Sequence, residues 1–192
     1  MIGDARVLDA IRAVPRDRFV PEAVRHEAWE NTSLPIGAGQ TISQPLVVAR
    51  MCAVLELHGE ETVLDVGTGS GYHAAILCRL AKHVYSIERH AELAARAREN
   101  LVGVPNVTLL AGDGTEGYAP AAPFDAINVA AAAAEVPRAL TDQLAPGGRL
   151  IAPVGGESHQ RLVLVRRTAD GFDRSDLERV AFVPLVSDAR GA

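Results

Sequence analysis

The sequence predicts an α/β fold: a doubly wound, mostly parallel, seven-stranded sheet with antiparallel edge strands. Three observations support this. From Thr62 onward, short β-like apolar runs alternate with helix-like runs, which is typical of parallel sheets. The first strand-like run leads into glycines at every second position, as in the ligand-binding loops of Rossmann-like folds. Near the C-terminus, two β-like runs follow each other with no room for a helix, which indicates an antiparallel pair at one edge.

Length and composition indicate one soluble domain. The chain has 192 residues, of which 48% are hydrophobic and 22% are charged. We expect residues 1–45 to form an N-terminal helix and an active-site loop, and residues 46–192 to form the core sheet and helices. A net charge of −5 gives no electrostatic reason for binding nucleic acid or a membrane surface. No signal peptide or membrane-spanning stretch is recognised, so a cytoplasmic location is expected. We also expect a monomer.

Two helices and a loop are predicted before the first strand of the sheet. The apolar spacing predicts helices over Val7–Val14, which Pro15 ends, and over Leu46–Leu57, which Gly59 ends. Between them, Leu34–Pro45 combines glycines, prolines and hydroxyl residues. An apolar loop placed just before a helix is a good position for a binding site.

The sheet elements follow in order. Strands are predicted at Thr62–Val66, His83–Glu88, Asn106–Leu110, Phe124–Val129 and Leu150–Val154. Helices are predicted from the glycine loop to about Lys82, over Ala91–Leu101 and over Glu135–Leu144. The closing antiparallel pair is predicted at Arg161–Arg167 and Arg179–Leu185.

The glycine loop allows three interpretations. Counted from Gly67, it has the acid-x-G-x-G-x-G pattern of S-adenosylmethionine (SAM) methyltransferases. Counted from Gly69, it has the G-x-G-x-x-A pattern of dinucleotide-binding domains, ending at Ala74. In both cases the glycines let the backbone touch a ligand, and the helix behind them supplies free N–H groups. The third interpretation is a strand-to-helix turn without a ligand.

Three acidic residues near this loop favour SAM over NAD. Glu88 ends the second strand and is expected to face the ribose hydroxyls of a bound nucleoside; otherwise it is a surface acid. Asp113 follows the third strand, where it can meet an adenine amino group. Asp65 lies inside an apolar strand, where an ionised side chain needs a partner. A cationic ligand such as SAM supplies one, and no lysine or arginine is expected there.

Neither a metal site nor a reactive thiol is indicated. The six histidines lack ligand spacing, so no metal is expected. Cys52 and Cys78 occur in helix-like apolar runs, where cysteine usually acts as a small hydrophobe.

Several motifs together carry a family resemblance. They are Val14–Pro21, Leu34–Pro45, Gly67–Tyr72, Tyr85–Arg89, Gly112–Gly114, Ala122–Asp125, Pro153–Gly155 and Phe182–Leu185. Through them the chain, from about Val7 to Leu185, resembles the protein-L-isoaspartate O-methyltransferase family. The Gly39–Pro45 stretch, Gly-Gln-Thr-Ile-Ser-Gln-Pro, is the most specific of these motifs.

The resemblance implies a class I SAM methyltransferase acting on damaged proteins and peptides. It implies methyl transfer to the free α-carboxylate of L-isoaspartyl residues, which starts their repair to aspartate and leaves S-adenosyl-L-homocysteine. Ser43 is implied as the active-site residue that aims the acceptor carboxylate; its alternative role is an N-cap of the next helix. The residues expected around the cofactor are Thr41, Ile42, Asp65, Gly67, Thr68, Gly69, Gly71, Glu88, Asp113, Gly114 and Gln160.

Two other functions stay open from the sequence. One is a family member that methylates aspartyl or isoaspartyl residues of a single dedicated peptide. The other is a module that binds SAM or a dinucleotide without chemistry.

Overall fold

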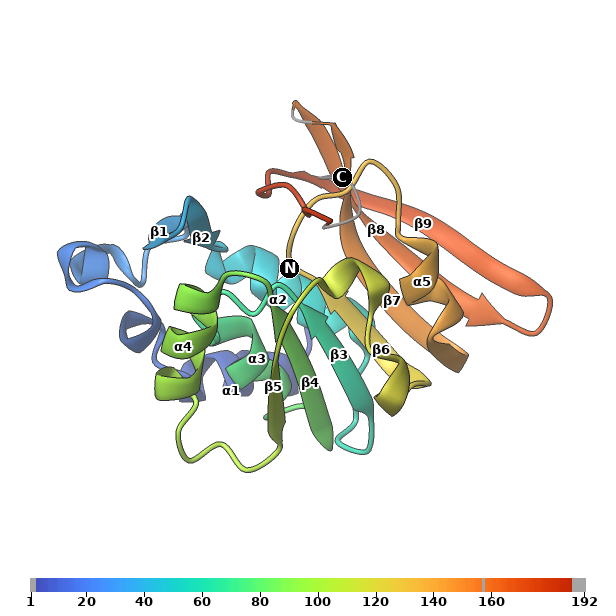
Figure 1. Ribbon diagram of the computed structural model, residues 1–192, viewed down its shortest axis with the longest axis horizontal. Helices are drawn as coiled ribbons and strands as arrows, with labels where there is room; N and C mark the ends of the chain where they lie inside the picture. Colours follow the sequence, from blue (N-terminus) through green and yellow to red (C-terminus); the bar gives the residue numbers. More distant parts are fainter. Residues whose placement is uncertain (1–2, 157, 188–192) are drawn as a thin grey trace.

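A seven-stranded sheet runs through the molecule in the order β5-β4-β3-β6-β7-β8-β9 (Figure 1). The computed structural model describes residues 3–156 and 158–187. Neighbouring strands from β5 to β7 pair in parallel, and β8 and β9 add two antiparallel pairings at one edge. This confirms the predicted fold class. A separate small sheet pairs β1 with β2.

The elements have the following bounds. The strands are β1 (Leu34–Gly37), β2 (Gln40–Ile42), β3 (Thr62–Val66), β4 (His83–Glu88), β5 (Val107–Ala111), β6 (Phe124–Val129), β7 (Leu144–Gly156), β8 (His159–Thr168) and β9 (Gly171–Val180). The α-helices are α1 (Ala5–Ala13), α2 (Pro45–Leu55), α3 (Tyr72–Leu77), α4 (Ala91–Asn100) and α5 (Arg138–Asp142). The 3-10 turns are η1 (Arg16–Phe19), η2 (Glu22–Glu27), η3 (Gly114–Glu116) and η4 (Ala119–Ala121). Within the described residues, no helix is long and apolar enough to cross a membrane.

The sheet separates two apolar cores. Alternate residues of a strand point to opposite faces, so Val63 packs on one side and Leu64 on the other. Helices α1 to α4 contribute to the first core. The second core is covered by α5 and by the segment that carries η3 and η4. Both faces are buried, which explains why the central strands are almost continuously apolar.

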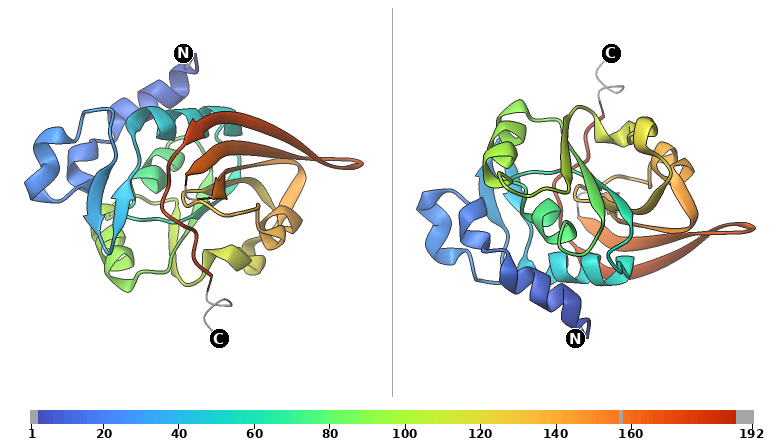
Figure 2. Two further views of the ribbon diagram at one scale, coloured as in Figure 1. Left: turned by 90° about the horizontal axis from the view of Figure 1, so that it is seen from above. Right: turned by 90° about the horizontal axis from the view of Figure 1, so that it is seen from below.

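The loop predicted before α2 is a β-hairpin. Leu34 pairs with Ile42 and Pro35 with Thr41, and the turn at Gly37–Gly39 has positive φ throughout. The strands are short and interrupted by proline and glycine, so their pattern does not identify them as strands. Seen from above, this hairpin lies beside the red C-terminal segment over one end of the sheet (Figure 2).

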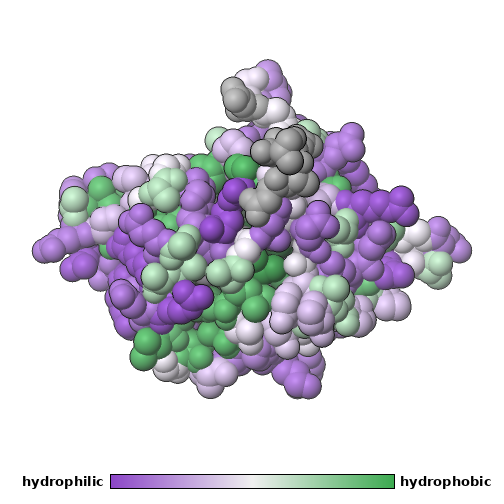
Figure 3. Space-filling model, in the orientation of Figure 1, coloured by the Kyte–Doolittle hydropathy of each residue, from purple (hydrophilic) through white to green (hydrophobic). Residues whose placement is uncertain are grey.

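The last strand was predicted in the wrong place. The partner of β8 is Gly171–Val180 rather than Arg179–Leu185. Its residues are nearly all exposed and mostly polar, so no alternation of apolar residues marks it as a strand. The hairpin that β8 and β9 form projects from the molecule, with mostly hydrophilic residues at its end (Figures 1 and 3). Predictions were also wrong in length for α3 and α5, which are shorter than expected, and for β7, which is longer.

Residues 181–187 form a strap that returns across the sheet. Ala132 N donates to Val183 O at 2.8 Å, and Leu185 N donates to Ala132 O at 2.7 Å. These bonds tie the strap to the loop after β6. The apolar run Phe182–Leu185 therefore covers the ends of the central strands rather than extending the sheet.

Gly71 offers a test of the packing behind the glycine loop. It starts α3 with φ +94°, and an added Cβ would lie 3.1 Å from Cδ1 of Leu101. We expect Gly71→Ala to lower the free energy of unfolding by about 2–4 kcal/mol, through backbone strain and overpacking. Gly103→Ala is the matched control, because Gly103 has φ +86° and no neighbour within 4 Å of the added Cβ.

Urea denaturation of both variants separates the two contributions. The control carries the backbone strain alone, so it should lose about 1 kcal/mol. Equal losses in the two variants would show that Leu101 does not constrain this position.

Candidate functional site

The glycine loop lies at the point where the order of the strands in the sheet reverses. It follows β3, between β4 and β6. Gly67 N and Thr68 N donate to Ile87 O at 2.9 and 3.2 Å, and Ala130 N donates to Val66 O at 2.8 Å. Ligands of doubly wound sheets bind at such a switch point, beyond the carboxyl ends of the strands.

A cavity of about 70 Å³ lies over this loop, and we call it the glycine-loop cavity. Gly67, Gly69 and Gly114, three of the residues expected around the cofactor, line it. The β1–β2 hairpin closes one side, because Cδ1 of Ile36 lies 3.2 Å from where a Gly69 Cβ would be. The strap closes another side with residues 183–186.

Glu88 presents a carboxylate to the glycine-loop cavity. Its Oε2 accepts from Gly69 N and its Oε1 from His90 N, both at 2.8 Å. The side chain is buried, yet it lines the cavity. A carboxylate has about four acceptor positions, so both oxygens keep a lone pair for ligand hydroxyl groups.

Ser43 lines a second cavity of about 330 Å³, which we call the Ser43 cavity. Three residues line both cavities: Thr41, Ala130 and Val183. Thr41 comes from the hairpin and Val183 from the strap, so distant segments of the chain form the boundary. A group transferred from one cavity to the other passes beside these three residues.

Ser43 does not cap α2. The N-cap residue is Gln44, whose side chain makes no capping bond; Asn31 Oδ1 instead accepts from Leu46 N in the first turn at 3.1 Å. The alternative role that the sequence allowed for Ser43 is therefore absent from the structure. Its backbone is fixed instead, because the Arg16 guanidinium donates from Nη2 to Ser43 O at 3.0 Å.

Arg16 is a positioning residue that the sequence did not reveal. Its side chain is fully buried and also donates to Ala28 O and Thr32 O. Burial lowers the pKa of Arg16 from its ordinary value. Arginines are mostly exposed, so an arginine next to Pro15 gives no signal of this role.

Asp65 is buried within the sheet and does not line the glycine-loop cavity, where a cationic ligand was expected to be its partner. The carboxylate is completely buried, with Oδ2 accepting from Ser86 Oγ at 2.6 Å and Oδ1 from Asn128 Nδ2 at 2.7 Å. Burial raises the pKa of Asp65, and both hydrogen bonds oppose that rise. Neutral donors from β4 and β6 meet its need for a partner.

Four other predicted cofactor residues do not line the glycine-loop cavity. Ile42 is buried in the core, and Thr68 Oγ1 bonds to Ser86 Oγ at 2.6 Å. Gly71 packs against Leu101. Asp113 lies between two glycines that line the cavity, but its Oδ1 accepts from the N and Oγ1 of Thr115.

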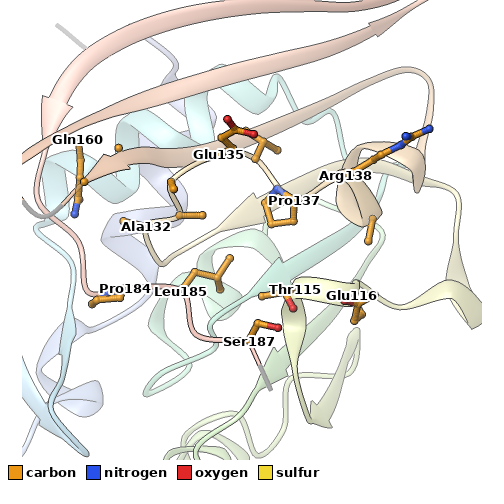
Figure 4. A pocket seen from close by; sticks show the side chains of 16 residues that line it. Thr115, Glu116, Ala132, Glu135, Pro137, Arg138, Gln160, Pro184, Leu185 and Ser187 are labelled. Atoms are coloured by element: carbon orange, nitrogen blue, oxygen red, sulfur yellow. The ribbon is translucent and has the colours of Figure 1, made fainter. Parts of the chain in front are cut away.

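Gln160 also lies away from the glycine-loop cavity. It lines a more open hollow of about 690 Å³, where Figure 4 shows it across from Leu185 and Ser187 of the strap. Its amide bonds the strap in both directions, donating to Phe182 O at 3.1 Å and accepting from Phe182 N at 2.7 Å. Gln160 therefore positions the strap.

The charges around the cavity also differ from the prediction. Arg89 lines the glycine-loop cavity, although no basic residue was expected there. Among the described residues that line it, Asp65 is absent and Glu88 is the acidic one. Among the described residues, the structure thus places one carboxylate at this cavity, that of Glu88, instead of the expected three.

Comparison with known proteins decides the family. The family model for protein-L-isoaspartate(D-aspartate) O-methyltransferase matches residues 1–190. The chain belongs to this family. A protein-L-isoaspartate O-methyltransferase of Pseudomonas paraeruginosa is 51% identical over 189 residues, covering 97% of this chain and 90% of that protein. One from Halorhodospira halophila is 54% identical over 188 residues, covering 96% and 86%.

Solved structures of the family share the fold. A protein-L-isoaspartate O-methyltransferase superposes with a TM-score of 0.85 at 26% identity, over 96% of this chain but 62% of that longer chain. A Plasmodium falciparum chain described as belonging to the same family, in complex with S-adenosyl-L-homocysteine, gives a TM-score of 0.81 at 26% identity. That match covers 96% of this chain and 91% of the other.

His73 links the glycine-loop helix to the buried network and should make stability depend on pH. Its Nδ1 lies 3.2 Å from Asn128 Nδ2 and its Nε2 lies 3.3 Å from Cys52 Sγ. Burial lowers the pKa of His73 to about 4. The unfolded chain, with an ordinary pKa near ~6.5, therefore takes up a proton first as the pH falls.

We expect the contribution of neutral His73 to the free energy of unfolding to be complete above pH 6.5. It should be lost as the pH falls from 6.5 to 4. From pH 7.5 to 5 this loss is about 2 kcal/mol. His73→Gln should remove that part of the decline, as measured by urea denaturation at both pH values. The raised pKa of Asp65 acts in the opposite direction in both proteins. Identical declines in wild type and variant would contradict the assignment.

Proposed function

We propose that this protein transfers a methyl group from SAM to the free α-carboxylate of L-isoaspartyl residues in damaged proteins and peptides. The following backbone nitrogen attacks the resulting ester, methanol leaves and a succinimide forms; water then reopens it partly as normal aspartate, which starts repair. The observation that carries the proposal is the pair of cavities that meet at Thr41, Ala130 and Val183 in a chain of this family. We further propose that the enzyme acts as a cytoplasmic monomer.

The residues around the glycine-loop cavity fit the chemistry of SAM. The glycines admit a ligand to the backbone, and Glu88 can accept ribose hydroxyls. A nucleoside site usually encloses several hundred cubic ångströms, whereas this cavity has about 70 Å³. Binding therefore requires the strap or the hairpin to move outward. Bound SAM supplies an activated methyl group on a sulfonium.

The protein's role in the reaction is to place the acceptor and exclude water. A carboxylate has a pKa near ~4 and is ionised at neutral pH, so it needs no general base. In the proposal, Ser43 donates a hydrogen bond that aims the acceptor oxygen across the boundary formed by Thr41 and Ala130. Arg16 keeps the Ser43 backbone in place. Positioning and desolvation then lower the barrier.

Incubation with labelled SAM and two peptides tests the reaction. We expect an isoaspartyl peptide to take up the label and its aspartyl twin to take up none. Label on one particular aspartyl peptide would favour the dedicated-peptide alternative. SAM binding with no labelled acceptor would favour the module without chemistry, and would overturn the proposal.

Glu88 should carry much of the cofactor affinity. We expect Glu88→Ala to weaken SAM binding by about 1.5–3 kcal/mol, because charge-assisted hydrogen bonds to the ribose are lost. Calorimetry with SAM, S-adenosyl-L-homocysteine and NAD measures this, and NAD should not bind to wild type. Glu99→Ala, an exposed acid on α4, is the control. Unchanged SAM affinity in Glu88→Ala would remove this residue from the site.

Ser43 should affect the rate and leave cofactor binding alone. We expect Ser43→Ala to lower turnover of an isoaspartyl peptide roughly 30- to 150-fold, the value of one charge-assisted hydrogen bond to the reacting group. Stability should change by less than about 0.5 kcal/mol, since no capping bond is lost. Ser33→Ala, at an exposed serine of the same cavity, should keep most activity. Wild-type turnover in Ser43→Ala would show that the hydroxyl does not touch the acceptor.

A further inference from the structure

The Ser43 cavity contains one charged residue among the described residues that line it, and that residue is Arg179. The rest of the lining is neutral, either polar or apolar. Arg179 lies near the end of β9, just before the strap, and is exposed. A single cation in an otherwise neutral cavity favours ligands that bring a negative charge.

The acidic residues near Arg179 are already paired with other arginines. Glu178 accepts from Arg50 Nε at 3.0 Å. Asp176 pairs with Arg174 at 3.4 Å. Within the described part of the chain, Arg179 itself forms no ion pair. Its cross-strand neighbour is Arg161, so two like charges face each other at the sheet edge. Like charges directly opposite are unfavourable, and an anion beside Arg179 would relieve that repulsion.

Arg179 lies where the Ser43 cavity borders a further hollow, which Ser43 does not line. The residues shared with the glycine-loop cavity are Thr41, Ala130 and Val183, and Arg179 is not among them. Instead it also lines this further hollow, beside Ser158 and beside His159 at the start of β8. The reacting carboxylate must lie near the shared residues to receive the methyl group. Arg179 therefore faces a neighbouring part of the acceptor peptide.

We propose that Arg179 determines acceptor specificity by selecting isoaspartyl peptides with an acidic side chain next to the damaged residue. This rests on the function proposed above. The ion pair involves groups that stay charged throughout methyl transfer, so it acts equally on the bound substrate and the transition state. It lowers KM for the peptide and leaves kcat unchanged.

A peptide series measures this preference. The reference peptide carries one isoaspartyl residue flanked by alanines, and each variant places a single glutamate at one flanking position. We expect glutamate at one or more positions to raise kcat/KM about threefold to fivefold over the reference, as for a partly exposed ion pair. In Arg179→Gln the kcat/KM of the glutamate peptide should fall to that of the reference, through a higher KM. Arg179→Glu should instead prefer a lysine-flanked peptide.

Arg161→Gln is the matched control, because it removes the same charge from the facing strand at a residue that does not line the Ser43 cavity. Arg161 contributes only the like-charge repulsion that an anion would relieve, so Arg161→Gln should keep the larger part of the ratio. The inference is overturned if no acidic position is preferred, or if both variants reduce the ratio equally.

The reference peptide distinguishes this inference from the proposed function. If wild type and Arg179→Gln methylate the reference peptide with equal kcat, the proposed function stands. This holds whatever the glutamate peptides show about kcat/KM. Failure of wild type to methylate any isoaspartyl peptide overturns both proposals.

Discussion

A buried carboxylate holds together the three strands on which the site is built. Asp65 of β3 accepts hydrogen bonds from Ser86 of β4 and Asn128 of β6, at 2.6 and 2.7 Å. Ser86 also bonds to Thr68, the second residue of the glycine loop. A buried charge without partners costs several kcal/mol, so this register of the three strands is strongly favoured over any shifted one. The position of the loop backbone follows from it.

Two segments far apart in the sequence close over that fixed loop, and each is held by one buried polar side chain. Arg16 binds the backbone at Ser43, where the hairpin continues into α2. Gln160 binds the backbone of Phe182 at the start of the strap. Neither side chain lines the glycine-loop cavity, yet both determine where its walls lie. Positioning of this kind depends on backbone carbonyls and N–H groups, which every sequence has.

Contacts to backbone groups leave no sequence pattern, whereas buried strands do, and this explains how far the sequence could predict the molecule. The central sheet was predictable because buried parallel strands need apolar runs, and Glu88 and the glycines follow directly from the strand ends. Strand β9 was missed because it is polar and exposed, so its pairing leaves no pattern. The role of Arg16 was missed for a related reason, since its partners are carbonyl oxygens. Gln160 was assigned to the cofactor, although its amide is occupied by the strap.

Asp65 shows that one physical premise allows several partners, since the sequence suggested a cationic ligand and the structure has neutral donors. Because desolvation is costly, a carboxylate inside an apolar strand must have a partner, but the sequence does not identify which group this is. A cationic ligand, a salt bridge and neutral donors all satisfy it, and here Ser86 and Asn128 do. With Asp65 inside the sheet and Asp113 bonded to Thr115, Glu88 is the carboxylate at the glycine-loop cavity. Under the proposed function, recognition of the nucleoside therefore depends mainly on Glu88 and the loop backbone.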